Sequence, residues 1–223
     1  MKFINVPFLV YLLFCMLQAK AQNLVILCTA SLIPAQFEQR KKEYIEALKQ
    51  LPQLAVPFYV VENHLVGGPS FLDDYCSNVF YFACNNINLR NKGVNEAISM
   101  LKALELLNLN DETMVIKLTG RYQLRHFALF KLIKENPDCD AFVKYDSYGQ
   151  VYTGCYAMRY HCMKKMVQEM DLHRMEVEMI SIEKVVADFI HNNINAKKIY
   201  ILQDLGIMAH FFGDGSQITS MEL

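Results

Sequence analysis

The stretch Val115–Tyr122, VIKLTGRY, begins as an apolar run of strand length and ends in a glycine and an arginine. Its first half is typical of a strand buried in a sheet, and its end brings Arg121 to the point where that strand stops. In an open α/β sheet, ligands bind beyond the carboxyl ends of the strands. We therefore expect Arg121, together with Lys117 in the same strand, to meet an anionic ligand.

The rest of the chain alternates strand patterns with helix patterns, which predicts an α/β sandwich with a largely parallel central sheet. Apolar runs of strand length cover residues 24–28, 56–61, 79–83, 113–118, 141–144 and 150–158. Amphipathic helical stripes begin near residues 37, 94, 127 and 182. The sequence therefore predicts one sheet with helices packed against it.

Polar residues follow each of the first four predicted strands, at positions 29–31, 62–63, 85–86 and 119–121. Because the carboxyl ends of parallel strands meet at one edge, we expect Thr29, Glu62, Lys92 and Arg121 to lie on one face of the sheet. A helix that opens at Asn91, Lys92 and Gly93 adds free backbone N–H groups and a positive dipole end. Both features suit a phosphate group.

Length and composition limit the partners. The 223 residues are 53% hydrophobic, enough for one sizeable core, so we expect a single domain over residues 22–223. The formal net charge is −1 and no long basic run occurs. Without a basic field to hold the phosphate backbone, nucleic acid is not an expected partner.

Residues 1–21 are predicted to be a secretory signal peptide, with Lys2 before an apolar run at 3–17 and small residues before Gln22. An uncleaved membrane anchor through residues 3–17 is the alternative, although the run is shorter than the roughly 20 residues of a membrane span. Both interpretations place the protein outside the cytosol, in a secretory-pathway lumen, an envelope or the extracellular space. Six cysteines beyond the leader form an even set that an oxidising compartment could pair, or are small buried hydrophobes.

The strand order, the acidic Glu62 after the second strand, the NKGVNEA turn at 91–97 and the VIKLTGRY strand resemble small GT-A-type glycosyltransferases. The resemblance spans about residues 23–212. It implies a GT-A-like sandwich that binds a nucleotide-sugar and transfers the sugar to a carbohydrate, lipid or protein acceptor. It also implies Glu62 near the nucleotide base and Glu183, within MISIEKVVADFI, as the base that deprotonates the acceptor. It places the turn at 91–96, with Asn91, Lys92, Gly93 and Glu96, near the ribose and phosphates. Thr29 and Lys117 complete the residues expected to bind the donor.

One departure from this family concerns the metal. GT-A enzymes usually end the fourth strand with Asp-x-Asp, which holds a divalent cation, whereas this chain has Thr119, Gly120 and Arg121 there. The Asp138–Asp140 triplet follows Pro137 at a helix end and is predicted to be a surface turn. A divalent metal is therefore not expected, and Arg121 is expected to supply positive charge to the leaving diphosphate.

Structural interpretations of the same residues stay open. Lys117 can simply line a sheet edge, and Arg121 can pair with the carboxylate of Glu96. Glu183 lies in the first turn of a predicted helix, where any negative charge stabilises the helix through its dipole. The second function class is a non-catalytic, secreted or membrane-anchored GT-A-like binding protein that has lost the metal motif, because a fold does not guarantee activity.

Overall fold

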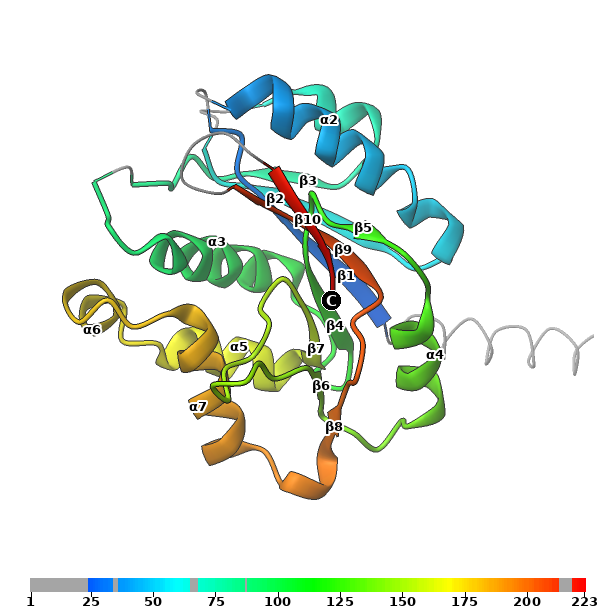
Figure 1. The fold of residues 1–223 in the computed structure, drawn as a ribbon, viewed down its shortest axis with the longest axis vertical. Coiled ribbons are helices and arrows are strands. Elements are labelled where there is room, and N and C mark those ends of the chain that lie inside the picture. The colour runs from blue at the N-terminus through cyan, green and yellow to red at the C-terminus, as the bar shows by residue number, and fades with distance from the viewer. Residues whose placement is uncertain (1–23, 34–35, 65–67, 87, 213–217) are drawn as a thin grey trace, which may run out of the picture.

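The structure is a computed structural model that describes residues 24–33, 36–64, 68–86, 88–212 and 218–223 (Figure 1). The predicted leader, residues 1–21, lies outside these ranges. None of the helices within the described ranges has both the length and the apolar character that a membrane crossing requires.

A seven-stranded sheet forms the centre of the molecule, in the order β3-β2-β1-β4-β7-β6-β8. Its strands are β1 (Leu24–Ala30), β2 (Phe58–Glu62), β3 (Val79–Tyr81), β4 (Met114–Thr119), β6 (Ala141–Val143), β7 (Cys155–Arg159) and β8 (Ile199–Ile201). Only β7 runs antiparallel to its neighbours β4 and β6, and the other neighbouring pairs are parallel. The prediction of an α/β fold with a mostly parallel central sheet is confirmed.

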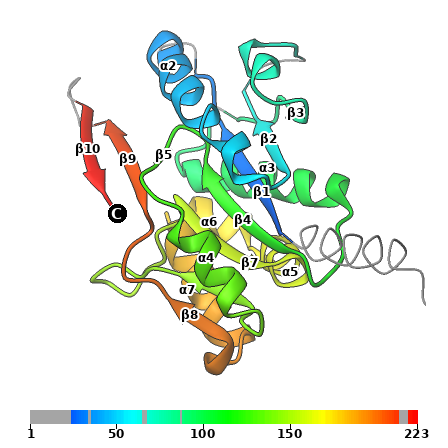
Figure 2. The ribbon, with the colours of Figure 1, turned by 90° about the vertical axis from the view of Figure 1, so that its right-hand side faces the viewer.

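Helices cover both faces of this sheet (Figure 1). One face carries α2 (Phe37–Leu48) and α4 (Ala128–Glu135), and the other carries α3 (Lys92–Leu107), α5 (Tyr160–Glu169), α6 (Leu172–Val177) and α7 (Ile182–Asn193). Three short 3-10 turns, η2 (Leu51–Leu54), η3 (Phe71–Asp74) and η4 (Ala196–Lys198), complete the described helical segments. A second, three-stranded sheet of β10 (Ile218–Glu222), β9 (Ile207–Phe212) and β5 (Gln123–Leu124) lies over the α2 and α4 face (Figure 2).

The side-chain alternation of β1 explains the two cores. Ile26 and Cys28 point into the core beneath α2 and α4, whereas Val25 and Leu27 point into the core beneath α3, α5 and α7. A strand covered on both faces reads as a continuous apolar run, and that is how β1 appears in the sequence.

The predicted strand at 150–158 is wrong in its first half. Val151 makes only an isolated bridge to Tyr145, and β7 begins at Cys155. Between them the chain folds back on itself, because the Cys155 N–H donates to the Tyr152 carbonyl at 3.4 Å. This turn becomes part of the candidate site described below.

All six cysteines that the structure describes are free thiols. Cys28, Cys76 and Cys155 lie in the core beneath α2, where they pack as small hydrophobic residues. Burial raises the pKa of the Cys155 thiol to about 12, partly offset by the charge of Lys117. The interpretation of cysteines as buried hydrophobic residues is confirmed for these three.

Candidate functional site

A cavity of about 550 Å³ lies at the carboxyl ends of β1, β2 and β4 and beside the loop after β3. The polar strand ends converge there, as the strand order predicts. From the strand ends, the lining residues are Thr29, Ala30, Ser31, Ile33, Asn63, His64, Asn85, Asn86, Leu89, Thr119, Arg121 and Tyr122. Helices, the turn before β7 and the end of the chain contribute Arg40, Tyr44, Lys92, Asn95, Glu96, Tyr152, Thr153, Gly154, Glu183 and Leu223.

Arg121 reaches this cavity from the turn after β4. The Gly120 N–H donates to the Thr29 carbonyl at 2.9 Å, which ties the turn to the end of β1. A Cβ atom on Gly120 would lie 3.2 Å from both the Thr29 oxygen and the Tyr44 ring, so glycine suits this close approach. The Arg121 side chain is 15% exposed, and its Nη1 lies 3.9 Å from Glu43 Oε2. The structure thus places a half-buried guanidinium at the strand ends.

Lys117 lies beneath the cavity and does not line it. Its side chain is 1% exposed and forms an ion pair with Glu96. Its ammonium also donates to Thr119 Oγ1 at 3.2 Å and to the Thr153 carbonyl at 2.5 Å. These partners match the three donors of an ammonium group, so the ligand contact expected of Lys117 is not what the structure shows. Lys117 instead supports Glu96, which does line the cavity.

Glu183 lines the cavity from the first turn of α7. Ser181 caps this helix by accepting from the Lys184 N–H at 3.2 Å, which fixes where the helix begins. Glu183 Oε1 accepts a hydrogen bond from Thr153 Oγ1 at 2.8 Å. The same threonine therefore contacts buried Lys117 through its carbonyl and Glu183 through its hydroxyl.

Glu62 lies at the expected edge but is not among the residues that line the cavity. Val60 and Val61 pack into opposite cores, so alternation along β2 turns Glu62 toward the α2 side. Its fully buried carboxylate accepts from the Leu32 N–H at 2.8 Å and from the His64 N–H at 3.0 Å. Glu62 is therefore on the same side of the sheet as Arg121, which lies beside Glu43 of α2, and its carboxylate orders the loops after β1 and β2. The contact with a nucleotide base that the resemblance implies stays a prediction.

The start of α3 also differs from expectation. The Asn91 side chain accepts from the Gly93 N–H at 3.0 Å, and the Asn91 N–H donates to Glu176 Oε2 at 3.0 Å. A Cβ atom on Gly93 would lie 2.9 Å from Ile182 Cβ, so this glycine packs against α7. The backbone N–H groups of Asn91 and Gly93 are therefore occupied by the protein's own side chains, and neither residue lines the cavity. Lys92, Glu96 and Thr29 do line it.

A network of asparagine side chains forms another part of the cavity wall. Asn85 Nδ2 donates to Asn63 Oδ1 at 3.3 Å, and Asn95 Nδ2 donates to Asn85 Oδ1 at 3.2 Å. Asn63 in turn donates to buried Ser99 at 3.0 Å. The polar strand ends at 62–63 and 85–86 are the sequence signal for Asn63 and Asn85, whereas Asn95 carries no such signal because it lies within a helix.

The cavity does not offer the donor set of a divalent cation. Thr119 and Arg121 occupy the end of β4, where an Asp-x-Asp pair would bind metal, and an arginine repels a cation. The two carboxylates on the wall are committed elsewhere, Glu96 to Lys117 and Glu183 to the Thr153 hydroxyl. Within the described ranges, no three histidine, cysteine, aspartate or glutamate side chains group as metal ligands.

The Asp138–Asp140 triplet lies away from this cavity. It precedes β6, which runs in the same direction as β4 because β7 is antiparallel to both. The triplet is therefore at the amino edge of the sheet. Asp140 pairs there with Lys198 at 3.1 Å and Arg159 at 3.9 Å. The turn interpretation agrees with this position.

No protein-family model and no curated protein sequence matches the chain. Among solved structures, it aligns with S. aureus TarS at a TM-score of 0.50 and 13% identity, over 82% of this chain and 59% of that structure. It also aligns with a glycosyltransferase involved in glycosylation of the major capsid of PBCV-1, at a TM-score of 0.49 and 8% identity, over 80% and 81% of the two chains. Alignment with the galactosyltransferase LgtC gives a TM-score of 0.41 and 14% identity, over 79% and 72%.

These likenesses concern the arrangement of the chain in space. The TarS alignment, over most of this chain, concerns the fold with its mostly parallel sheet. The chain has a GT-A-type glycosyltransferase-like fold.

Proposed function

We propose that this protein transfers a sugar from a nucleotide-sugar donor to the hydroxyl group of a carbohydrate, lipid or protein acceptor. One observation carries the proposal: a single cavity at the strand ends of a GT-A-like fold is lined by both Arg121 and Glu183. Arg121 offers positive charge to a leaving diphosphate, and Glu183 offers a carboxylate that can take the proton of the acceptor hydroxyl. Structural neighbours that are glycosyltransferases support this assignment.

In the proposed reaction, the acceptor oxygen attacks the anomeric carbon while the bond from that carbon to the diphosphate oxygen breaks. The diphosphate leaves with the bonding electrons, and the acceptor proton passes to Glu183. Arg121 offsets the negative charge that develops on the leaving group, so no divalent cation is needed in this scheme.

The alternative is a GT-A-like protein that binds a ligand without turnover. The observation that favours it is the loss of both Asp-x-Asp carboxylates at the end of β4. The two functions differ in one respect that an assay detects, because only the transferase releases nucleoside diphosphate from a nucleotide-sugar.

The test measures nucleoside diphosphate release from a panel of uridine and guanosine diphosphate sugars, with and without mixed acceptors. We expect turnover by the wild type and a loss of roughly 100-fold or more in Glu183→Gln, the usual scale for removing a general base. Asp188→Asn makes the same chemical change on the exposed face of α7 and is expected to leave turnover unchanged. Full activity in Glu183→Gln would show that this glutamate only stabilises the start of its helix. No turnover of any donor would favour the alternative of a binding protein without catalysis.

A further inference from the structure

Lys117 is a buried charge within a hydrophobic core. The register of the sheet places it between Leu27 of β1 and Tyr156 of β7, and both neighbours belong to the core beneath α3, α5 and α7. The lysine side chain is 1% exposed. Replacing a buried ion pair by apolar residues of similar volume is often neutral or stabilising, so stability alone does not explain a lysine at this position.

The ammonium group of Lys117 joins three segments that carry the cavity wall. It pairs with Glu96 of α3. It also donates to Thr119 Oγ1, at the end of β4, at 3.2 Å and to the Thr153 carbonyl, in the turn before β7, at 2.5 Å. All three of these partners line the cavity. One buried cation therefore holds α3, the end of β4 and the turn before β7 together beneath the cavity.

The turn before β7 carries this constraint to Glu183. The Thr153 hydroxyl donates to Glu183 Oε1 at 2.8 Å, and the Val151 N–H donates to the Glu183 carbonyl at 3.3 Å. The same turn is tied to the end of β4, because the Thr119 N–H donates to the Gly154 carbonyl at 2.8 Å. The Glu183 side chain is thus bound to a segment whose position the buried ammonium helps to fix.

The two carboxylates on this wall act on one buried residue. Burial raises the pKa of Tyr156, and the charges of Glu96 and Glu183 raise it further. Two carboxylates on one wall repel each other. Lys117 pairs directly with Glu96 and reaches Glu183 through Thr153, so its positive charge offsets this repulsion.

The turn that carries Arg121 has supports of its own. The Gly120 N–H donates to the Thr29 carbonyl at 2.9 Å, and the Tyr122 N–H donates to the Thr119 carbonyl at 2.9 Å. Loss of the Lys117 ammonium is therefore expected to disturb Glu183 more than Arg121.

We propose that Lys117 is a positioning residue, which holds the Glu183 carboxylate in place through Thr153 for its part in the transfer. Lys117 itself contacts neither donor nor acceptor in this scheme, since it lies beneath the cavity and does not line it. The inference rests on the proposed function for the role of Glu183, but the link between the two residues is also tested without turnover.

The experiment is a double-mutant cycle between Lys117→Met and Glu183→Gln, with kcat and the donor KM measured from nucleoside diphosphate release. Lys117→Met replaces the ammonium by an apolar chain of similar length. We expect kcat to fall on the order of 10-fold with the donor KM unchanged, the scale of one hydrogen bond to a charged group. In the Glu183→Gln background, the same substitution is expected to change kcat by less than about 2-fold.

Two further variants keep this cycle interpretable. Ile116→Val is the control for a general loss of stability, because Ile116 lies in the same strand and faces the opposite core. It is expected to lower the urea midpoint slightly and to leave kcat unchanged. If Lys117→Met does not fold, as its melting curve will show, Lys117→Met/Glu96→Gln takes its place. This double variant removes both charges of the buried pair and is compared with Glu96→Gln.

The outcomes separate this inference from the proposed function. Equal losses of kcat in the wild-type and Glu183→Gln backgrounds, or a rise in the donor KM alone, overturn the role of Lys117 and leave the proposed function standing. Absence of turnover by the wild type with every donor contradicts the proposed function instead. Urea unfolding of the same four proteins then decides the link, because shifts in midpoint that do not add support it and additive shifts overturn it.

Discussion

Thr153 connects a buried lysine to the carboxylate that we propose as the base. Burying a charge is unfavourable unless it is paired and hydrogen-bonded, and Lys117 meets that condition through Glu96, Thr119 and Thr153. The Thr153 backbone is thereby fixed, and its hydroxyl holds Glu183 Oε1 at 2.8 Å. The orientation of Glu183 thus depends in part on Lys117, which lies beneath the cavity and does not line it.

The first prediction at this scale concerns the Thr153 hydroxyl. Thr153→Val keeps the shape of the side chain and removes the donor, so kcat is expected to fall about 10-fold while KM for the donor stays unchanged. Thr153→Ser keeps the hydroxyl and is expected to retain most of the wild-type kcat. Steady-state kinetics on the three proteins checks both values. Equal losses in the two variants, or a rise in KM alone, would show that Thr153 acts through packing.

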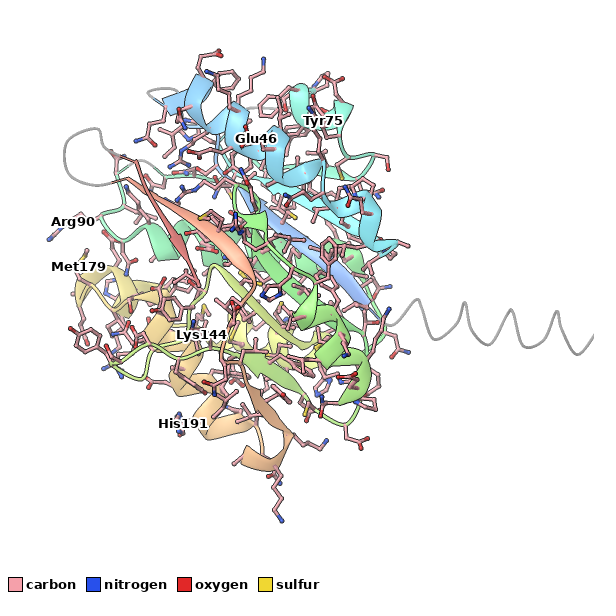
Figure 3. All side chains as sticks on the ribbon, turned by 45° about the vertical axis from the view of Figure 1, so that its right-hand side comes forward. Glu46, Tyr75, Arg90, Lys144, Met179 and His191 are labelled. Atoms are coloured by element: carbon pink, nitrogen blue, oxygen red, sulfur yellow. The ribbon has the colours of Figure 1, made fainter. Side chains whose placement is uncertain are left out.

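At the scale of elements, the start of α3 and the start of α7 are held together. Asn91 Nδ2 donates to the Met175 and Ile180 carbonyls at 2.8 and 2.7 Å, which joins α3 to the connection between α6 and α7. Arg90 and Met179 lie near each other at this edge of the molecule (Figure 3). Gly93 packs against Ile182, the residue before Glu183. The position of α7, and with it Glu183, therefore depends on this helix contact.

The prediction at the scale of elements is that Gly93→Ala destabilises the protein. Alanine favours a helix by up to about 1 kcal/mol over glycine, but its Cβ would lie 2.9 Å from Ile182 Cβ. Overpacking of this kind costs about 1–3 kcal/mol, so the clash outweighs the helix preference. Urea unfolding measures the difference, with Lys92→Ala as an exposed neighbour that is expected to change stability by less than about 0.5 kcal/mol. A more stable Gly93→Ala protein would contradict the packing role.

The sequence predicts the architecture better than the contacts of single residues. Apolar runs and helical stripes locate β1, β4, α3 and α7, because burial on one or both faces leaves a periodic signal. The same periodicity does not reveal that Lys117 pairs with Glu96 beneath the cavity, or that Glu62 turns toward the loop after β1. Those outcomes depend on which side chains from distant segments arrive beside each strand. Arg40 escapes prediction for a related reason, since a charged residue in an amphipathic helix reads as part of the solvated face.

Over the whole molecule, the cavity draws its lining from both faces of the sheet. The α2 side presents Arg40 and Arg121, and the α3 and α7 side presents Lys92, Glu96 and Glu183. Buried Glu43 lies beside Arg121, and buried Lys117 pairs with Glu96, so each side carries charges of both signs. Arg121 and Glu183 reach the cavity from different sides, which is the arrangement that the proposed transfer uses for its leaving group and its acceptor proton.

The central claim is that this cavity binds the diphosphate of a nucleotide-sugar through arginine and without a divalent cation. Its most direct test is calorimetric titration of the wild type and Arg121→Ala with uridine and guanosine diphosphate in the presence of a chelator. We expect the wild type to bind, with an affinity that the chelator leaves unchanged. Arg121→Ala is expected to lose on the order of 1.5–3 kcal/mol of binding free energy, the value of a hydrogen bond to a charged group. Absence of binding by either nucleotide, or binding that appears only when manganese is added, would contradict it.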